Sequence, residues 1–300
     1  MLPSPIIVNS LSKRFGNVIA LESVSFEVHR PCVIGLVGPN GSGKSTLLRL
    51  LMGSIRPSGG EVKLFGHSPR ESRLRHTDVG YLSSADRMFP ELTVLENMIY
   101  RGSMYGLNSK DCSMMACRLL RDRNLYHLRG RLPHTLSTGQ RRQVSLLSTL
   151  LHQPKVLLLD EPTTGIDIMA ITQIYRLMSE LCEDNCTIVL ATHHLEELVT
   201  LCQRTIALHD GQLVHDCATA DLGSSRDEVR DALQYLFLGR TFPVRPPAAS
   251  DDSSLSTVSH SPPPAELSLE EDRHPLGDPP RVVDFDRSEQ SPVRIQEFRQ

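Results

Sequence analysis

The fold of this chain is decided by one short stretch, Gly38-Pro39-Asn40-Gly41-Ser42-Gly43-Lys44-Ser45. It fits the pattern G-x-x-x-x-G-K-[ST], whose backbone N–H groups cradle the phosphates of a nucleotide. It follows the apolar run 33–37 and precedes residues 46–52, which have the pattern of a helix. Because the pattern has meaning only between a strand and a helix, this context favours phosphate binding over an ordinary glycine-rich turn.

Each part of this phosphate loop has a chemical task. The helix that follows directs its free N–H groups and the positive end of its dipole at the phosphates. Lys44 is expected to reach the β- and γ-phosphates, and the Ser45 hydroxyl is expected to bind Mg²⁺. The predicted nucleotide-binding residues of this segment are Gly38, Pro39, Asn40, Gly41, Ser42, Gly43, Lys44, Ser45 and Thr46.

Composition sets the class of protein. The 300 residues suffice for one large domain or two ordinary ones, and the formal net charge of −3 argues against a general nucleic-acid-binding protein. No stretch approaches the ~18–20 apolar residues that span a bilayer, and residues 1–5 lack the basic start of a secretory signal. The seven cysteines form no C-x-x-C pair, which favours free thiols in a reducing compartment.

The composition changes near Pro243. Residues 1–242 alternate strand-like apolar runs with helical patterns, as an α/β domain does. Residues 243–300 are rich in proline, serine and acidic side chains, and they cannot bury enough apolar surface to offset the entropy of ordering. The sequence therefore predicts one folded domain over 1–242 and a disordered tail over 243–300.

A second segment carries paired carboxylates, since the apolar run 156–159 is followed directly by Asp160 and Glu161. Such a run is typical of a buried parallel strand, and ligands of α/β sheets bind beyond the C-terminal ends of the strands. We expect Asp160 to hold Mg²⁺ through water and Glu161 to act as general base on the attacking water. Alone, the pattern also fits a buried strand capped by two solvated acids, but the phosphate loop favours the catalytic interpretation.

Between these segments lies Leu136-Ser137-Thr138-Gly139-Gln140, followed by a helical pattern. Ser137 stands where that helix begins, so its hydroxyl and the free N–H groups after it can meet an anion. Taken alone, the segment is better explained as an ordinary N-cap.

In this order the motifs resemble those of the ATP-binding cassette (ABC) ATPases. Residues 136–140 resemble the family's signature, and residues 162–167 are similar to its D-loop. The run 188–192 with His193 resembles the strand that carries its switch histidine. The resemblance covers residues 6–240, and the combination separates this family from other NTPases that share only the phosphate loop and the acidic strand.

The resemblance implies roles for individual residues. Phe15 matches the aromatic residue that stacks on adenine, although a core phenylalanine on an early strand is the alternative. His193 matches the histidine that contacts the γ-phosphate and acts in catalysis with Glu161 and Lys44, whereas His194 is the weaker candidate because the family's histidine directly follows the threonine of the strand. The implied nucleotide-binding residues outside the phosphate loop are Phe15, Ser84, Ser137, Thr138, Gly139, Gln140 and Asp167, and the metal-binding residues are Ser45 and Asp160.

Four departures from the family pattern concern the site. Ser84 stands where the family has a glutamine that contacts Mg²⁺ and the attacking water, and a serine needs a bridging water to reach them. Some drug- or polymer-export members resemble this chain in the run 86–93, so the serine affects the hydrolysis rate more than ATP binding. The other departures are Thr138 for the signature's first glycine, Gln143 and Ser148 for common arginines, and residues 29–32 for a Gly-Glu turn.

The predicted fold class is α/β: a P-loop NTPase core with a parallel sheet, an N-terminal antiparallel β subdomain, a helical subdomain inserted over about residues 92–150, and the disordered tail. Antiparallel strands are expected near 6–9, 24–28 and 61–65, and parallel strands at 33–37, 79–82, 156–160 and 187–191. A strand pair is expected at 205–208 and 212–214, with a closing helix at 227–238.

The resemblance implies the ATP-binding and hydrolysing subunit of a membrane exporter. Such a subunit uses ATP and Mg²⁺ at the cytoplasmic face of a membrane, pairs head to tail with a second ATPase subunit and drives a separate transmembrane permease. Two alternatives stay open. A soluble ABC ATPase acting on ribosomes or DNA is disfavoured by the single signature and the lack of sustained heptads. A regulatory module with little ATP turnover is favoured by Ser84 and Thr138 and opposed by Glu161 and His193.

Overall fold

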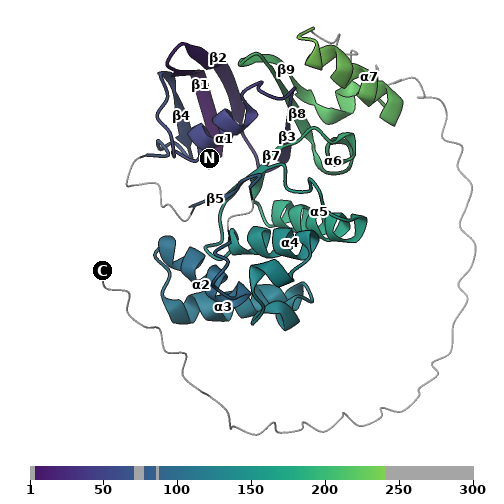
Figure 1. Ribbon diagram of the computed structural model, residues 1–300. Coiled ribbons are helices and arrows are strands. Elements are labelled where there is room, and N and C mark those ends of the chain that lie inside the picture. Colours follow the sequence, from purple (N-terminus) through teal and green to yellow (C-terminus); the bar gives the residue numbers. More distant parts are fainter. Residues whose placement is uncertain (1–3, 71–77, 86–87, 241–300) are drawn as a thin grey trace, which may run out of the picture. The chain divides into compact units, whose positions relative to one another are not determined.

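The computed structural model describes residues 4–70, 78–85 and 88–240. All of them lie in the first of the two units, 1–247 and 248–300, into which the chain divides. These residues form two β-sheets and a set of helices (Figure 1). The predicted tail with its boundary near Pro243, and Asp86 and Arg87 of the export-type run, lie outside the described residues and stay predictions.

The N-terminal sheet is antiparallel, as predicted, and its three strands lie in the order β2-β1-β4. Its strands are β1 (Ile6–Phe15), β2 (Val18–Val28) and β4 (Gly59–Leu64). The first two are much longer than the predicted segments near 6–9 and 24–28. The β1–β2 ladder is interrupted by register shifts, and Ser10 and Ser23 have positive φ angles of 44° and 50°. These irregularities break the alternation by which strands are predicted from sequence.

The second sheet has six strands in the order β5-β6-β7-β3-β8-β9. They are β3 (Val33–Val37), β5 (Val79–Leu82), β6 (Val156–Asp160), β7 (Thr187–Ala191), β8 (Arg204–His209) and β9 (Gln212–Ala218). The first five in spatial order are parallel, and β9 pairs antiparallel with β8. The four predicted parallel strands and the predicted strand pair are thus confirmed. Because β6, β7 and β3 are neighbours, their C-terminal ends meet at one edge of the sheet.

The helices are α1 (Lys44–Leu51), α2 (Val94–Met104), α3 (Ser109–Asp122), α4 (Thr138–Ser148), α5 (Ile168–Glu183), α6 (Leu195–Leu201) and α7 (Arg226–Phe237). Short 3₁₀ turns occur at Tyr126–Leu128, Pro133–Thr135 and Thr219–Leu222. Helices α2, α3 and α4 pack on one another, where a helical insertion was predicted (Figure 1). None of the described helices combines the length and the apolar character needed to cross a bilayer.

Strand β6 is buried on both faces. Leu157 and Leu159 belong to the core formed with helices α2 to α7, whereas Val156 and Leu158 belong to the core formed with α1 and the antiparallel sheet. This is the period of two expected of a strand between two layers. Replacing one of these leucines by alanine typically costs about 2–5 kcal/mol of stability. The acids that follow β6 are therefore mounted on a rigid element.

Candidate nucleotide site

The phosphate loop joins β3 to α1, which begins at Lys44. Its turns depend on glycines that have no room for a side chain. A Cβ at Gly38 would lie 2.1 Å from the carbonyl oxygen of Leu208. Gly43 has a φ of 105°, and a Cβ there would lie 2.6 Å from the carbonyl oxygen of Ala20. Larger residues at either position would force the loop open.

The polar groups of this loop suit an anion. Lys44 Nζ donates hydrogen bonds to the carbonyl oxygens of Gly38 (2.7 Å) and Pro39 (3.0 Å). Burial lowers the pKa of Lys44, although the nearby Glu161 and Asp160 act against it. The Ser42 hydroxyl is buried without a hydrogen-bond partner among the described residues. A buried donor without an acceptor calls for an explanation, and the phosphate oxygens of a nucleotide supply the acceptors that this loop lacks.

The Ser45 hydroxyl, on the first turn of α1, faces the Asp160 carboxylate at the end of β6. Ser45 Oγ donates to Asp160 Oδ1 at 3.1 Å. Burial raises the pKa of Asp160 and outweighs the opposing effect of the Ser45 hydrogen bond. Two such oxygen ligands suit Mg²⁺, which usually takes one or two protein oxygens and completes its shell with water and phosphate oxygens. The residues present therefore fit a magnesium–nucleotide complex.

Glu161 is held at the end of β6 from both sides. Its backbone N–H donates to the carbonyl oxygen of Ala191 at 2.9 Å. Its Oε1 lies 3.0 Å from His193 Nδ1, and its Oε2 accepts a hydrogen bond from Thr164 Oγ1 at 3.0 Å. Burial raises the pKa of Glu161, but the hydrogen bonds from His193 and Thr164 outweigh burial, so the net shift is downward. The carboxylate is therefore ionised at neutral pH and can accept a proton.

The two adjacent histidines are placed differently. His193 is exposed and contacts Glu161. His194 is half-buried, its backbone N–H donates to Thr192 Oγ1 at 2.9 Å, and its ring lies tilted beside that of His193 with centroids 4.1 Å apart. The contact with the carboxylate is thus made by the first histidine after the strand.

The signature segment begins α4. Ser137 is the N-cap, and the Ser137 Oγ and Gln140 Oε1 atoms satisfy each other's backbone N–H groups in a capping box. Thr138 is exposed, whereas Gly139 is buried against Asp167, whose Oδ2 would lie 2.8 Å from a Cβ at position 139. Signature and D-loop thus lie together, but α4 lies well apart from α1 in Figure 1. Among the described residues, no hydrogen bond joins residues 137–140 to the phosphate loop of the same chain.

Two further predicted residues lie on the surface. The Phe15 side chain is 48% exposed at the end of β1, with the Lys13 ammonium 4.8 Å from the ring centroid. The alternative of a core phenylalanine is therefore wrong. Ser84 is exposed and follows β5 by two residues.

Sequence reasoning missed three polar residues that support this edge of the sheet. Thr164 bonds to Glu161. Glu197 is fully buried on α6 and accepts a hydrogen bond from Thr163 Oγ1, so it joins the segment after β6 to the helix that follows His193 and His194. Glu197 has no sequence signal of its own, because only the tertiary contact with Thr163 marks it. The third is Arg142 on α4, which has no recognisable sequence signal.

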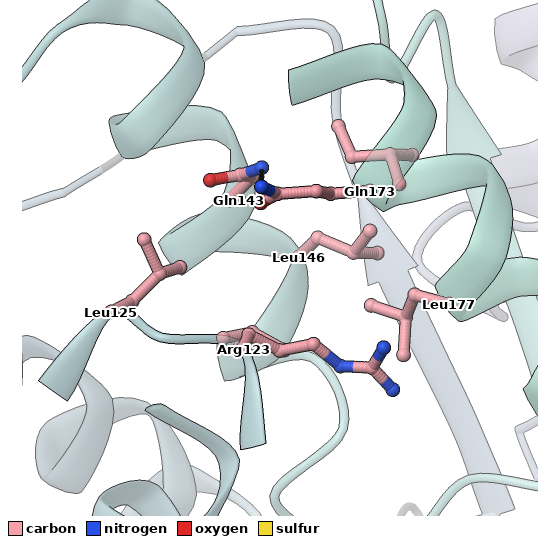
Figure 2. A pocket seen from close by; sticks show the side chains of 8 residues that line it. Arg123, Leu125, Gln143, Leu146, Gln173 and Leu177 are labelled. Atoms are coloured by element: carbon pink, nitrogen blue, oxygen red, sulfur yellow. Dashed lines mark hydrogen bonds between the residues drawn. The ribbon is translucent and has the colours of Figure 1, made fainter. Parts of the chain in front are cut away.

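A hollow between α4 and α5 is separate from these residues (Figure 2). Leucines such as Leu146 and Leu177 line it, and Gln143 Nε2 donates to Gln173 Oε1 at 2.6 Å beside it. Ser148 Oγ donates within α4 to the carbonyl oxygen of Val144. The two residues that replace arginines of the family pattern therefore have local partners.

Comparison with known proteins gives consistent results. Residues 21–164 match the sequence family described as ABC transporter. The chain is 34% identical over 218 residues to "Nod factor export ATP-binding protein I" of Paraburkholderia xenovorans (strain LB400), covering 72% of each chain. It is 35% identical over 210 residues to "Probable sulfate/thiosulfate import ATP-binding protein CysA" of Chlorella vulgaris, covering 70% of this chain and 89% of the relative.

A solved structure titled "Structure of ATP binding subunit of ABC transporter" superposes with a TM-score of 0.69 at 26% identity, covering 78% of this chain and all of that one. Fold, motif order and relatives therefore agree. The family hydrolyses ATP with Mg²⁺, and its ATP-binding subunits are membrane-associated, peripheral parts of transporters. The chain belongs to the ABC transporter family, as an ATP-binding subunit with the family's ATPase domain.

Proposed function

We propose that this chain hydrolyses ATP at the C-terminal edge of its parallel sheet to drive export through a separate membrane subunit, with Glu161 as the general base. The observation that carries the proposal is the convergence of two contacts there, Ser45–Asp160 at 3.1 Å and Glu161–His193 at 3.0 Å. The Ser45–Asp160 pair offers oxygen ligands to Mg²⁺, and the Glu161–His193 pair offers a proton acceptor to an attacking water.

The residues divide the reaction between them. The phosphate loop and Lys44 would bind the phosphates, and Ser45 and Asp160 would hold Mg²⁺, which would neutralise phosphate charge when bound. Glu161 accepts the proton of a water that attacks the γ-phosphorus, while the bond to the bridging oxygen breaks and ADP leaves with the electron pair. His193, bonded to Glu161, contacts the γ-phosphate.

A second ATPase subunit completes the site in this proposal. Within the described part of the chain, Ser137, Thr138, Gly139 and Gln140 make no hydrogen bond to the phosphate loop, and in this proposal they serve the nucleotide of a partner subunit. Ile168 and Met169 directly follow Asp167 and are 79% and 72% exposed. Apolar side chains exposed in this way beside the signature support burial in a head-to-tail pair.

In this proposal the chain lies at the cytoplasmic face of a membrane, and the transporter that it drives is an exporter. The support is the similarity to proteins named for Nod factor export, although a relative named for sulfate import is equally similar. The test has two steps. The tagged chain is purified from detergent-solubilised membranes and the co-purifying membrane protein is identified. The pair is then placed in vesicles, and ATP-driven movement of its substrate is measured. Release to the side away from the ATPase supports export, and uptake toward it contradicts export.

A further inference from the structure

We propose that Arg142 is a positioning residue for Glu161, which ties the backbone of the proposed base to the signature helix. The inference rests on the proposed role of Glu161. It assigns a task to a residue that none of the motifs includes.

Arg142 is 6% exposed, and its guanidinium group is directed at three consecutive carbonyl oxygens. Nε donates to Pro162 O at 2.9 Å, and Nη2 donates to Asp160 O at 3.0 Å and to Glu161 O at 2.8 Å. Burying a charged group is unfavourable unless its hydrogen bonds are made. A planar fork of donors can serve several carbonyls at once, which a lysine ammonium on a flexible chain does less well.

The backbone that Arg142 holds is strained. Glu161 has a φ of 49°, the left-handed region that side-chain-bearing residues rarely adopt. Such conformations persist only where the surroundings fix them, and they concentrate at functional sites. On one side, the N–H of Glu161 is fixed by Ala191 O. On the other side, Arg142 holds the carbonyls of Glu161 and Pro162. The hydrogen bonds made with Ala191 and Arg142 thus fix the Glu161 backbone from both sides, and this directs the Glu161 side chain toward His193.

Arg142 also connects elements that are distant in sequence. It lies in the second turn of α4, whose first turn is the signature segment. Its Nη1 donates to Ser83 O at 2.7 Å, next to Ser84. One side chain thus links the signature helix, the loop after β5 and the turn after β6. A shift of α4 changes the position of the base through this contact.

We expect substitutions of Arg142 to lower the turnover of ATP while leaving ATP binding nearly unchanged. Arg142→Gln should lower kcat for ATP hydrolysis about tenfold or more, because a misplacement of about 1 Å is costly in catalysis. The KM and the Kd for ATP should stay within about twofold, because the carbonyl oxygens that accept hydrogen bonds from Arg142 belong to residues 83 and 160–162 and not to the phosphate loop. Arg142→Lys, which keeps the charge and loses the fork, should fold normally and lose kcat to an intermediate degree.

The experiment is a double-mutant cycle with Glu161→Gln, measured as single-turnover hydrolysis with Mg-ATP. Residues that act as a unit are strongly non-additive. Arg142→Gln should therefore lower the rate in the wild-type chain and change it by less than about twofold in the Glu161→Gln background. The matched control is Arg101→Gln, which removes another helical guanidinium bonded to a carbonyl of this region, Tyr81 O at 2.8 Å. It should leave kcat nearly unchanged.

Equal losses in both backgrounds would overturn the positioning role, and so would parallel loss of ATP binding in Arg142→Lys. If Arg142→Gln does not fold, the same cycle with Arg142→Lys decides between the outcomes. A Glu161→Gln chain with wild-type turnover would instead refute the proposed base. The single variant thus tests the proposed function, and the cycle tests Arg142.

Discussion

His193 Nδ1 lies 3.0 Å from Glu161 Oε1, which joins the ends of the neighbouring strands β7 and β6. The contact gives the carboxylate a defined direction and lowers its pKa together with the hydrogen bond from Thr164. A carboxylate that is ionised and oriented meets both requirements of a general base. The contact also explains why we assign the catalytic role to His193, the first histidine after β7, and not to His194.

We predict that His193→Ala abolishes most ATP hydrolysis, whereas His194→Ala changes it little. Of the two histidines, His193 contacts Glu161, whereas the backbone N–H of His194 donates to Thr192. Steady-state ATPase assays of the two variants, each checked for ATP binding, decide the matter. A larger loss in His194→Ala would show that the assignment of the switch histidine is off by one residue.

Phe15→Ala should weaken ATP binding and leave folding intact. A base stacked on an aromatic side chain contributes about 1–3 kcal/mol, and the exposed ring contributes little to the core. Titration with a fluorescent ATP analogue measures the affinity, and thermal melting measures the fold. Phe15→Tyr serves as the control and should bind normally. Unchanged affinity in Phe15→Ala would remove this residue from the site.

Ser84→Ala should lower hydrolysis by no more than about threefold, about 0.6 kcal/mol in barrier. The reason is that a serine at this exposed position reaches the metal or the water only through another water. Ser84→Gln, which restores the side chain of the family pattern, should raise the basal rate. Rates at saturating Mg-ATP test both. A loss on the order of 10²-fold in Ser84→Ala would instead indicate a direct contact in the transition state.

His152 should make stability depend on pH. Its ring is buried and stacked on Tyr105 with centroids 3.8 Å apart, and its Nε2 lies 3.1 Å from Val79 O. Burial lowers the pKa of His152 to about 4. Protonation would also place a second N–H at Nδ1, which is buried without a partner among the described atoms.

The sign follows from proton uptake. Between pH 4 and pH 6.5 the unfolded chain binds a proton that the folded chain does not, so stability falls as the pH drops through that range. The full effect is on the order of 3 kcal/mol. Denaturant unfolding of the wild type and of His152→Gln at pH 7.5, 5.5 and about 4.5 measures it, and the variant should show a shallower pH dependence. Parallel curves for the two proteins would contradict the assignment.

The parallel strands were predictable because each is a continuous apolar run buried on both faces. The residues 156–160 and 187–191 were placed correctly for that reason. The N-terminal strands were underestimated because bulges at Ser10 and Ser23 interrupt their alternation. Strand β9 extends to Ala218 beyond the predicted segment because it lies at the sheet edge and is only partly buried.

The contacts that support the site were less predictable than its motifs. Ser45, Asp160 and Glu161 could be proposed as site residues from their fixed spacing from glycines and strand ends. Arg142 bonds to carbonyl oxygens of residues 83 and 160–162, and any residue supplies a carbonyl, so no side-chain pattern marks the partners. Glu197 needed the tertiary contact between α6 and the turn after β6 to become recognisable.

The central claim is that Glu161 takes the proton of the attacking water, and Glu161→Gln tests it most directly. The glutamine keeps the shape of the side chain and removes its capacity to accept a proton. Hydrolysis of Mg-ATP should fall about 10²-fold or more, while ATP binding is retained and the ATP-bound pair of subunits is trapped closed. Turnover at the wild-type rate in this variant would contradict the account.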